Sequence, residues 1–164
     1  MSILENQAIP LMASIKPLRA REASQRWRAA YDLADAQLAA FRLRLFQYIL
    51  AMDDHVYTNP KPKNEKANEW NVRWSRKIIM PDKDQFERLK TTFKLKLTRE
   101  EYLAMVQEQT DEAKQRLNYV SEQHPGTPWA QRAQRELRDG FGMQFSDRFW
   151  DPRYRDNKVK VPKL

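Results

Sequence analysis

The strongest constraint on this chain is the long stretch from Glu22 to Asp54, which contains neither proline nor glycine. Within it, large or apolar residues recur at steps of four and three: Trp27, Tyr31, Ala34, Leu38, Phe41, Leu45, Tyr48 and Met52. This spacing places all of them on one stripe of an α-helix. We therefore predict a first helix about 50 Å long, whose stripe packs against another helix at a shallow angle.

Residues 99–123 predict the helix that packs on this stripe. Thr98 and Glu101 have the spacing of a capping box, in which each side chain accepts a hydrogen bond from the backbone amide of the other residue. The apolar positions again step by three and four: Leu103, Val106, Thr110, Ala113, Leu117 and Val120. A shorter helix over residues 83–96 is predicted from its apolar side, which carries Phe86, Leu89, Phe93 and Leu97.

A short link, His124 to Pro128, is followed by the last predicted helix, residues 128–139. Thr127 can cap this helix, and Pro128 falls at its first position, where the missing amide proton costs nothing. Gly140 is a typical C-terminal stop, and we expect Ala130, Ala133 and Leu137 to face inward. Two helices joined by so short a link predict an αα-hairpin.

Only three glycines occur in the chain, and tight β-hairpins commonly use glycine at positive φ. The sequence therefore predicts an all-α fold: a small helical bundle with a long first helix, a C-terminal αα-hairpin and an extended tryptophan-containing loop. The predicted organisation is an N-terminal extension (1–21), a helical domain (22–142, with its loop at 56–80) and an aromatic and basic C-terminal tail (143–164).

Aromatic and cationic residues interleave in one part of the loop: Trp70, Arg73, Trp74, Arg76 and Lys77. Trp70, Val72 and Trp74 alternate with polar residues, as in a strand, and we interpret the segment as extended and packed on the helices. The tryptophans could stack on the bases of single-stranded nucleic acid while the cations contact phosphates. Alternatively, both tryptophans anchor the loop in the helical core while the cations stay in water.

Positive charge is concentrated in the middle of the chain. The net charge is +8, and residues 57–100 hold 12 basic and 6 acidic side chains. Such an excess attracts anionic partners of any kind, including nucleic acid and acidic proteins. In the tail, aromatic rings lie among arginines, and they either pack back on the domain or anchor another protein.

The residue types needed for catalysis or metal binding are scarce. The chain has no cysteine and two histidines, His55 and His124, and it has no phosphate-binding loop, nucleophile elbow or His-Glu-x-x-His run. We interpret His55 as part of a polar helix end and the acids Asp32 and Asp35 as solvated. We therefore expect no enzyme, cofactor or metal site. No apolar run approaches the length of a membrane span and no signal-peptide pattern opens the chain, which favours a soluble, cytoplasmic protein.

These features predict a non-catalytic protein–protein interaction or scaffold module. Its partner would be another protein or another part of a longer parent chain. The contact candidates are Trp70, Arg73, Trp74, Arg76, Lys77, Phe145, Phe149, Trp150, Arg153 and Tyr154. The alternative is a nucleic-acid-binding protein that uses residues 57–100 and the tail, whose binding should weaken steeply with salt.

Three stretches carry a family resemblance: Arg26 to Ala34, the loop around Asn68-Glu69-Trp70, and His124 to Leu137 with its His-Pro-Gly-Thr-Pro-Trp-Ala start. Together they resemble the C-terminal helical region of von Willebrand factor A domain-containing proteins of planctomycete bacteria. The A domain and its Asp-x-Ser-x-Ser metal motif are missing here. The resemblance therefore implies a helical scaffold with an interaction role and supplies no catalytic residue. The terminal hairpin is also similar to tetratricopeptide-type hairpins.

Overall fold

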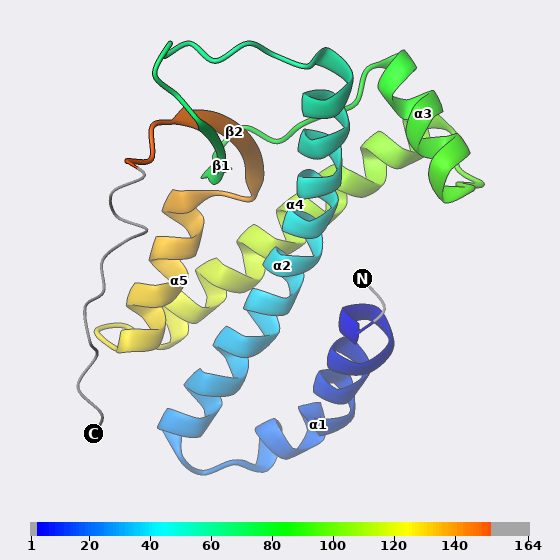
Figure 1. The fold of residues 1–164 in the computed structure, drawn as a ribbon. Coiled ribbons are helices and arrows are strands. Elements are labelled where there is room, and N and C mark those ends of the chain that lie inside the picture. Colours follow the sequence, from blue (N-terminus) through cyan, green and yellow to red (C-terminus); the bar gives the residue numbers. More distant parts are fainter. Residues whose placement is uncertain (1–2, 152–164) are drawn as a thin grey trace, which may run out of the picture.

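The computed structural model describes residues 3–151 (Figure 1). In chain order its elements are a short π-helix η1 (Leu4–Ala8), α1 (Ile9–Arg21), α2 (Gln25–Thr58), β1 (Glu69–Ser75), α3 (Lys83–Phe93), α4 (Arg99–Gln123), α5 (Pro128–Asp139) and β2 (Gly142–Arg148). The described chain is predominantly helical, but β1 and β2 form a two-stranded antiparallel sheet. The predicted all-α class is therefore corrected to a mostly helical fold with a small sheet.

The local signals at helix ends fix most boundaries. The predicted helices over 99–123 and 128–139 are α4 and α5, and the capping box of Thr98 and Glu101 is present. The long helix α2 begins after Ser24, whose side chain accepts a hydrogen bond from the Trp27 amide, and it extends four residues beyond Asp54 to Thr58. The predicted 83–96 helix is shorter, because Lys94 adopts a left-handed conformation and ends α3 at Phe93.

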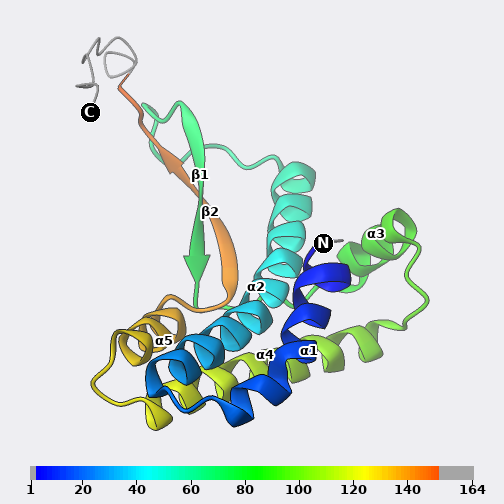
Figure 2. The same ribbon diagram turned by 90° about the horizontal axis from the view of Figure 1, so that it is seen from below.

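The core lies where α2 packs along the α4–α5 hairpin (Figure 2). From α4 it contains the predicted positions Val106, Thr110, Ala113, Leu117 and Val120, and from α5 it contains Ala130 and Ala133. The predicted stripe of α2 does not form this seam. The buried positions are instead Ala29, Asp32, Ala36, Ala40, Leu43, Arg44, Gln47, Leu50 and Ala51. Four of the buried α2 residues are alanines, whose small side chains let the facing helices approach closely.

The extended tryptophan segment, predicted without a partner, pairs with a strand from the predicted tail. Val72 lies opposite Phe145, and Trp74 lies opposite Met143. The pairing satisfies backbone groups that neither segment could satisfy alone. It takes residues 142–148 into the folded unit, so a tail beginning at residue 143 is a wrong description of that part. The predicted extension, by contrast, forms η1 and α1.

Two glycines allow β2 to pass close to the chain that follows β1. Gly140 has φ of +80°, and a Cβ there would lie 2.6 Å from the Ser75 carbonyl oxygen. A Cβ on Gly142 would collide with the Lys77 carbonyl oxygen. The same Gly140 that ends α5 therefore also makes room for the sheet, which stands beside α2 on the side away from α1 (Figure 2).

Candidate binding surface

The apolar stripe predicted from the sequence exists, but it faces away from the core. None of its eight members is buried. Trp27 is 64% exposed, Phe41 39%, Leu45 37% and Tyr48 39%. Large apolar side chains left in water along one helix face are typical of an interaction surface. We call this set, Trp27, Tyr31, Ala34, Leu38, Phe41, Leu45, Tyr48 and Met52, the outer stripe.

One edge of the outer stripe is covered by α1. The hydroxyl of Tyr31 donates a hydrogen bond to the Met12 carbonyl oxygen at 3.0 Å. Leu38 lines a small cavity together with Ile9 and Met12. No residue of α1 is itself buried, so this cover is thin. The remaining stripe faces solvent between α1 and the sheet.

At the other edge, a buried arginine holds Trp74 in place. The guanidinium carbon of Arg44 lies 4.3 Å from the ring centre of Trp74, 5.9 Å from that of Phe41 and 5.6 Å from that of Phe141. Trp74 keeps 46% of its surface exposed. Trp74 and Phe41 both lie against the same guanidinium, so Arg44 links the strand tryptophan to the outer stripe.

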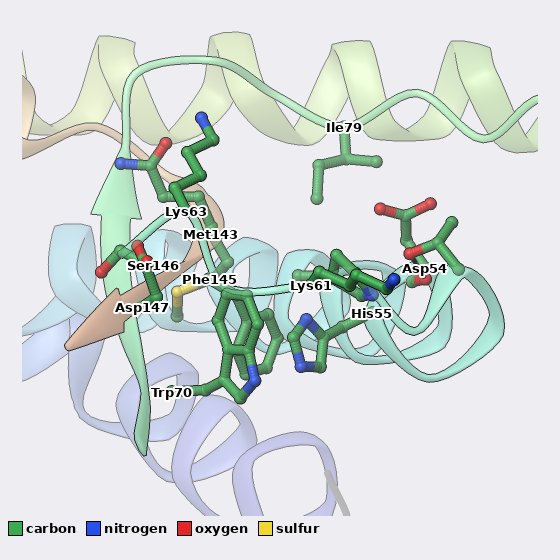
Figure 3. Close-up of a pocket in the computed structure, with 14 residues that line it drawn as sticks. Asp54, His55, Lys61, Lys63, Trp70, Ile79, Met143, Phe145, Ser146 and Asp147 are labelled. Carbon is green, nitrogen blue, oxygen red and sulfur yellow. Dashed lines mark hydrogen bonds between the residues drawn. The ribbon is translucent and has the colours of Figure 1, made fainter. Parts of the chain in front are cut away.

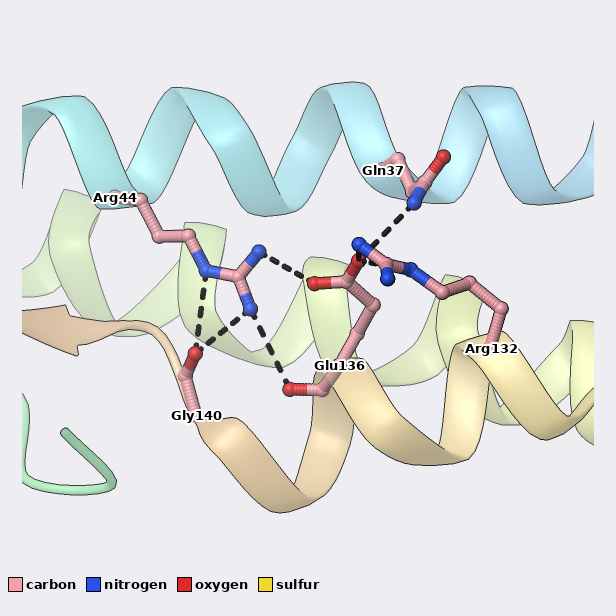
Figure 4. A network of polar contacts seen from close by, with 5 residues as sticks. All are labelled: Gln37, Arg44, Arg132, Glu136 and Gly140. Atoms are coloured by element: carbon pink, nitrogen blue, oxygen red, sulfur yellow. Dashed lines mark hydrogen bonds and ion pairs between the residues drawn. The ribbon is translucent and has the colours of Figure 1, made fainter. Parts of the chain in front are cut away.

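Arg44 is fixed by a buried polar network (Figure 4). Its guanidinium pairs with the carboxylate of Glu136 and donates to the Gly140 carbonyl oxygen at 2.9 Å. Gln37 and Arg132 donate to the same carboxylate at 3.0 and 2.9 Å. Burial alone would raise the pKa of Glu136, but hydrogen bonds from Arg44 and Gln37 outweigh it and hold this pKa below its ordinary value. The network therefore holds Arg44 in position under the ring of Trp74.

A second network fixes α1 and the end of α4. Both carboxylate oxygens of Asp32 accept from Arg19, at 2.9 and 2.7 Å, and His124 Nε2 lies 2.8 Å from Asp32 Oδ2. Desolvation alone would raise the pKa of Asp32. The hydrogen bonds with Arg19 and His124 outweigh this effect and hold the pKa below its ordinary value. The interpretation of Asp32 as a solvated surface acid is therefore wrong.

An open cationic groove adjoins Trp74. It is lined by Arg73, Trp74, Arg76, Lys77 and Arg138, with Asp139 as its acidic member. The Nε of Arg76 donates to the Arg138 carbonyl oxygen at 2.8 Å, so this arginine also holds the end of α5. The structure thus brings the predicted cations together with Trp74, and it adds Arg138, which the sequence analysis did not single out.

Trp70 and Phe145 lie elsewhere, at the C-terminal end of α2 (Figure 3). The ring of His55 stacks on Phe145 at 4.2 Å, and Trp70 meets it edge-on at 4.6 Å. These residues border a cavity of about 520 Å³, which Asp54, Lys61, Lys63 and Asp147 also line. His55 is therefore part of an aromatic cluster that holds the sheet to α2, which the interpretation as a polar helix end did not foresee.

The remaining candidates lie near the C-terminal limit of the described chain. Phe149 is 49% exposed. The backbone amide and carbonyl of Trp150 are both bonded to the side chain of Asn68, at 2.8 Å each. Arg153 and Tyr154 fall outside the described residues, so their predicted contact role stays a prediction.

Within residues 3–151, no group of three or more histidine, cysteine or acidic side chains is arranged to hold a metal ion. Of the described helices, none combines the length and apolarity needed to cross a membrane. A comparison of the chain with protein-family models, curated proteins and solved structures found no match. The resemblance to the helical region of von Willebrand factor A domain-containing proteins therefore stays a prediction.

Proposed function

We propose that this chain is a non-catalytic protein-interaction module and that its partner docks on the outer stripe of α2 and on Trp74. The observation that carries this proposal is the position of the largest apolar side chains of α2. They repeat with helical spacing along the whole helix, yet they lie on the face turned away from α4 and α5. Among the described residues, α1 covers one edge of this face, and Trp27, Phe41, Leu45 and Tyr48 remain exposed to solvent.

Covering this face with a partner would stabilise a complex. Full burial of one large apolar side chain contributes about 1.5–3 kcal/mol, and Trp27, Phe41, Leu45 and Tyr48 are each between a third and two thirds exposed. Their exposed parts together contribute on the order of a few kcal/mol. Tryptophan and tyrosine are also the residues that most often dominate binding energy at interfaces.

The support beneath Trp74 favours recognition. Arg44 lies under its ring and is itself bonded to Glu136 and Gly140, so the ring is oriented before a partner arrives. A side chain that is already ordered loses less entropy on binding.

The test is site-specific photo-crosslinking of the full chain in its native cell extract. A crosslinker at Leu45, in the middle of the outer stripe, should yield a partner adduct that the Tyr48→Asp variant loses. A crosslinker at Phe93, which is 51% exposed on α3, is the matched control and should not yield that adduct. The same adduct from both positions, or no effect of Tyr48→Asp, would contradict the proposal.

A second candidate function is nucleic-acid binding, and the cationic groove favours it. Arg73, Arg76, Lys77 and Arg138 line one open groove beside an exposed tryptophan, as sites for single strands do. Binding of a single-stranded oligonucleotide should then weaken steeply with salt. The double change Arg73→Ala/Lys77→Ala should lower the slope of log affinity against log salt by about 1.4, at about 0.7 per phosphate contact.

A further inference from the structure

The outer stripe is shaped for a helix rather than for a loop or a strand. Its members, Trp27, Tyr31, Ala34, Leu38, Phe41, Leu45, Tyr48 and Met52, are all exposed or half-buried, and none of them is charged. They step by three and four residues over about 38 Å. A row of this period matches the ridges of another α-helix lying along α2 at a shallow angle.

The sheet beside this row carries a positively charged groove. Trp74 contacts the same guanidinium as Phe41, and Trp74 also lines the groove with Arg73, Lys77 and Arg138. Trp74 thus adjoins both the apolar row and a cluster of cations. Asp139 is the one acid that lines this groove, so its net charge is positive.

From these two observations we infer the chemistry of the partner segment: an amphipathic helix whose apolar face lies along the outer stripe and whose flank toward β1 carries carboxylates. This inference rests on the proposed function and names the class of partner. Aspartate or glutamate side chains on that flank meet the groove cations, and complementary charge speeds and orients association. A second copy of this chain would instead bring a further net charge of +8 against the same cations.

The test uses three synthetic helical peptides of about 24 residues with the same leucine-bearing face. They differ only in one flank, which carries glutamate, glutamine or lysine. Fluorescence anisotropy with the full chain at low salt should show the glutamate peptide binding at least tenfold more tightly than the lysine peptide. The difference should shrink at about 1 M salt, where the screening length falls to about 3 Å.

Two variants separate the apolar and the ionic parts. Leu45→Asp should abolish binding of all peptides, because it places a charge in the middle of the row. The double variant Arg73→Ala/Lys77→Ala should weaken the glutamate peptide several-fold, toward the affinity of the glutamine peptide, and leave the glutamine peptide unchanged. Circular dichroism of each variant checks that the helical fold is kept.

Several results would overturn the inference. Equal binding of all three peptides, lost in Leu45→Asp, would refute the acidic flank and leave the apolar docking surface intact. Binding of none of them would refute the helical occupant, and the crosslinking at Leu45 would then decide the proposed function on its own. A dimer in sedimentation that Leu45→Asp dissociates would make a second copy the occupant. Displacement of the glutamate peptide by a single-stranded oligonucleotide that binds more tightly would assign the groove to nucleic acid.

Discussion

The two faces of α2 differ in a way that reverses the usual expectation. The inner face, against α4 and α5, is built largely from small residues such as Ala36 and Ala40, with Leu43 among them. The outer face carries Phe41, Leu45 and Tyr48, each more than a third exposed. The larger hydrophobic surface of this helix is therefore the one left in water.

The inner face of α2 packs against α4 and α5, and we propose that its outer face binds a partner. Small side chains on the inner face allow close approach, so the stability of the fold comes from tight contacts over a narrow seam. Polar groups on that face are satisfied, as when Gln47 donates to the Ile79 carbonyl oxygen and accepts from the Ile79 amide. The outer face does not pack against α4 or α5. Its large, exposed apolar side chains have the size and chemistry that a docking surface needs.

The largest effect is expected from removing the carboxylate that anchors Arg44 on the inner side. Glu136→Ala leaves a guanidinium buried without its charged partner and should lower the free energy of unfolding by about 3–5 kcal/mol. Urea unfolding followed by circular dichroism measures this loss. Arg132→Ala is the control, because Arg132 contacts the same carboxylate from a half-exposed position, and it should cost less than about 1 kcal/mol. Similar losses in both variants would argue against the anchoring role.

Truncating matched leucines two positions apart tests the difference between the faces directly. Leu43 is fully buried, while Leu45 is 37% exposed. Leu43→Ala should reduce the free energy of unfolding by about 2–5 kcal/mol through lost burial and a cavity. Leu45→Ala should change it by about 0.5 kcal/mol while weakening partner binding. Equal destabilisation by the two changes would remove the distinction between an inner and an outer face.

Acid should weaken the packing around α2 through two buried carboxylates, Asp32 on α2 and Glu136 on α5. The pKa of Asp32 and that of Glu136 are both lower in the folded chain than their ordinary values of 3.8 and 4.5. Their stabilisation is therefore fully present above the ordinary values and is lost as the pH falls through the folded-state values. Asp32→Asn should cost about 1.5–3 kcal/mol near neutral pH. Its unfolding free energy should also depend less on pH below about 4, and parallel curves for variant and wild type would contradict this.

The sequence was enough to predict the elements that carry their own end signals. Thr98 with Glu101, and Thr127 with Pro128 and Gly140, fixed α4 and α5 because capping depends on neighbours in the chain. The seam positions of α4, such as Ala113 and Leu117, were also predicted correctly, since one face of that helix is clearly more apolar.

The orientation of α2 and the sheet could not be obtained in this way. Two stripes with helical period coexist on α2, and ranking them by side-chain size selects Phe41 and Leu45 over Ala36 and Ala40. The alanine spacing was a usable signal, because small residues permit close helix approach. Trp74 pairs with Met143, and Arg44 forms an ion pair with Glu136. Both contacts join residues far apart in the chain, so no local sequence pattern predicts them.

The smallest effect concerns α1, which covers the edge of the outer stripe at Tyr31 and Leu38. Arg42 pairs with Glu5 at 2.7 Å, and both side chains are about a third exposed, so Arg42→Ala should lower the global free energy of unfolding by less than about 1 kcal/mol. The amides of α1 should nevertheless exchange with deuterium faster, because no α1 residue is buried and local opening needs little free energy. Hydrogen–deuterium exchange with mass spectrometry measures this, and Lys114→Ala, which removes an exposed pair within α4, is the control. Faster exchange in α4 as well as in α1 would mean that α1 belongs to the same cooperative unit as the inner face, and would contradict local opening of α1 alone.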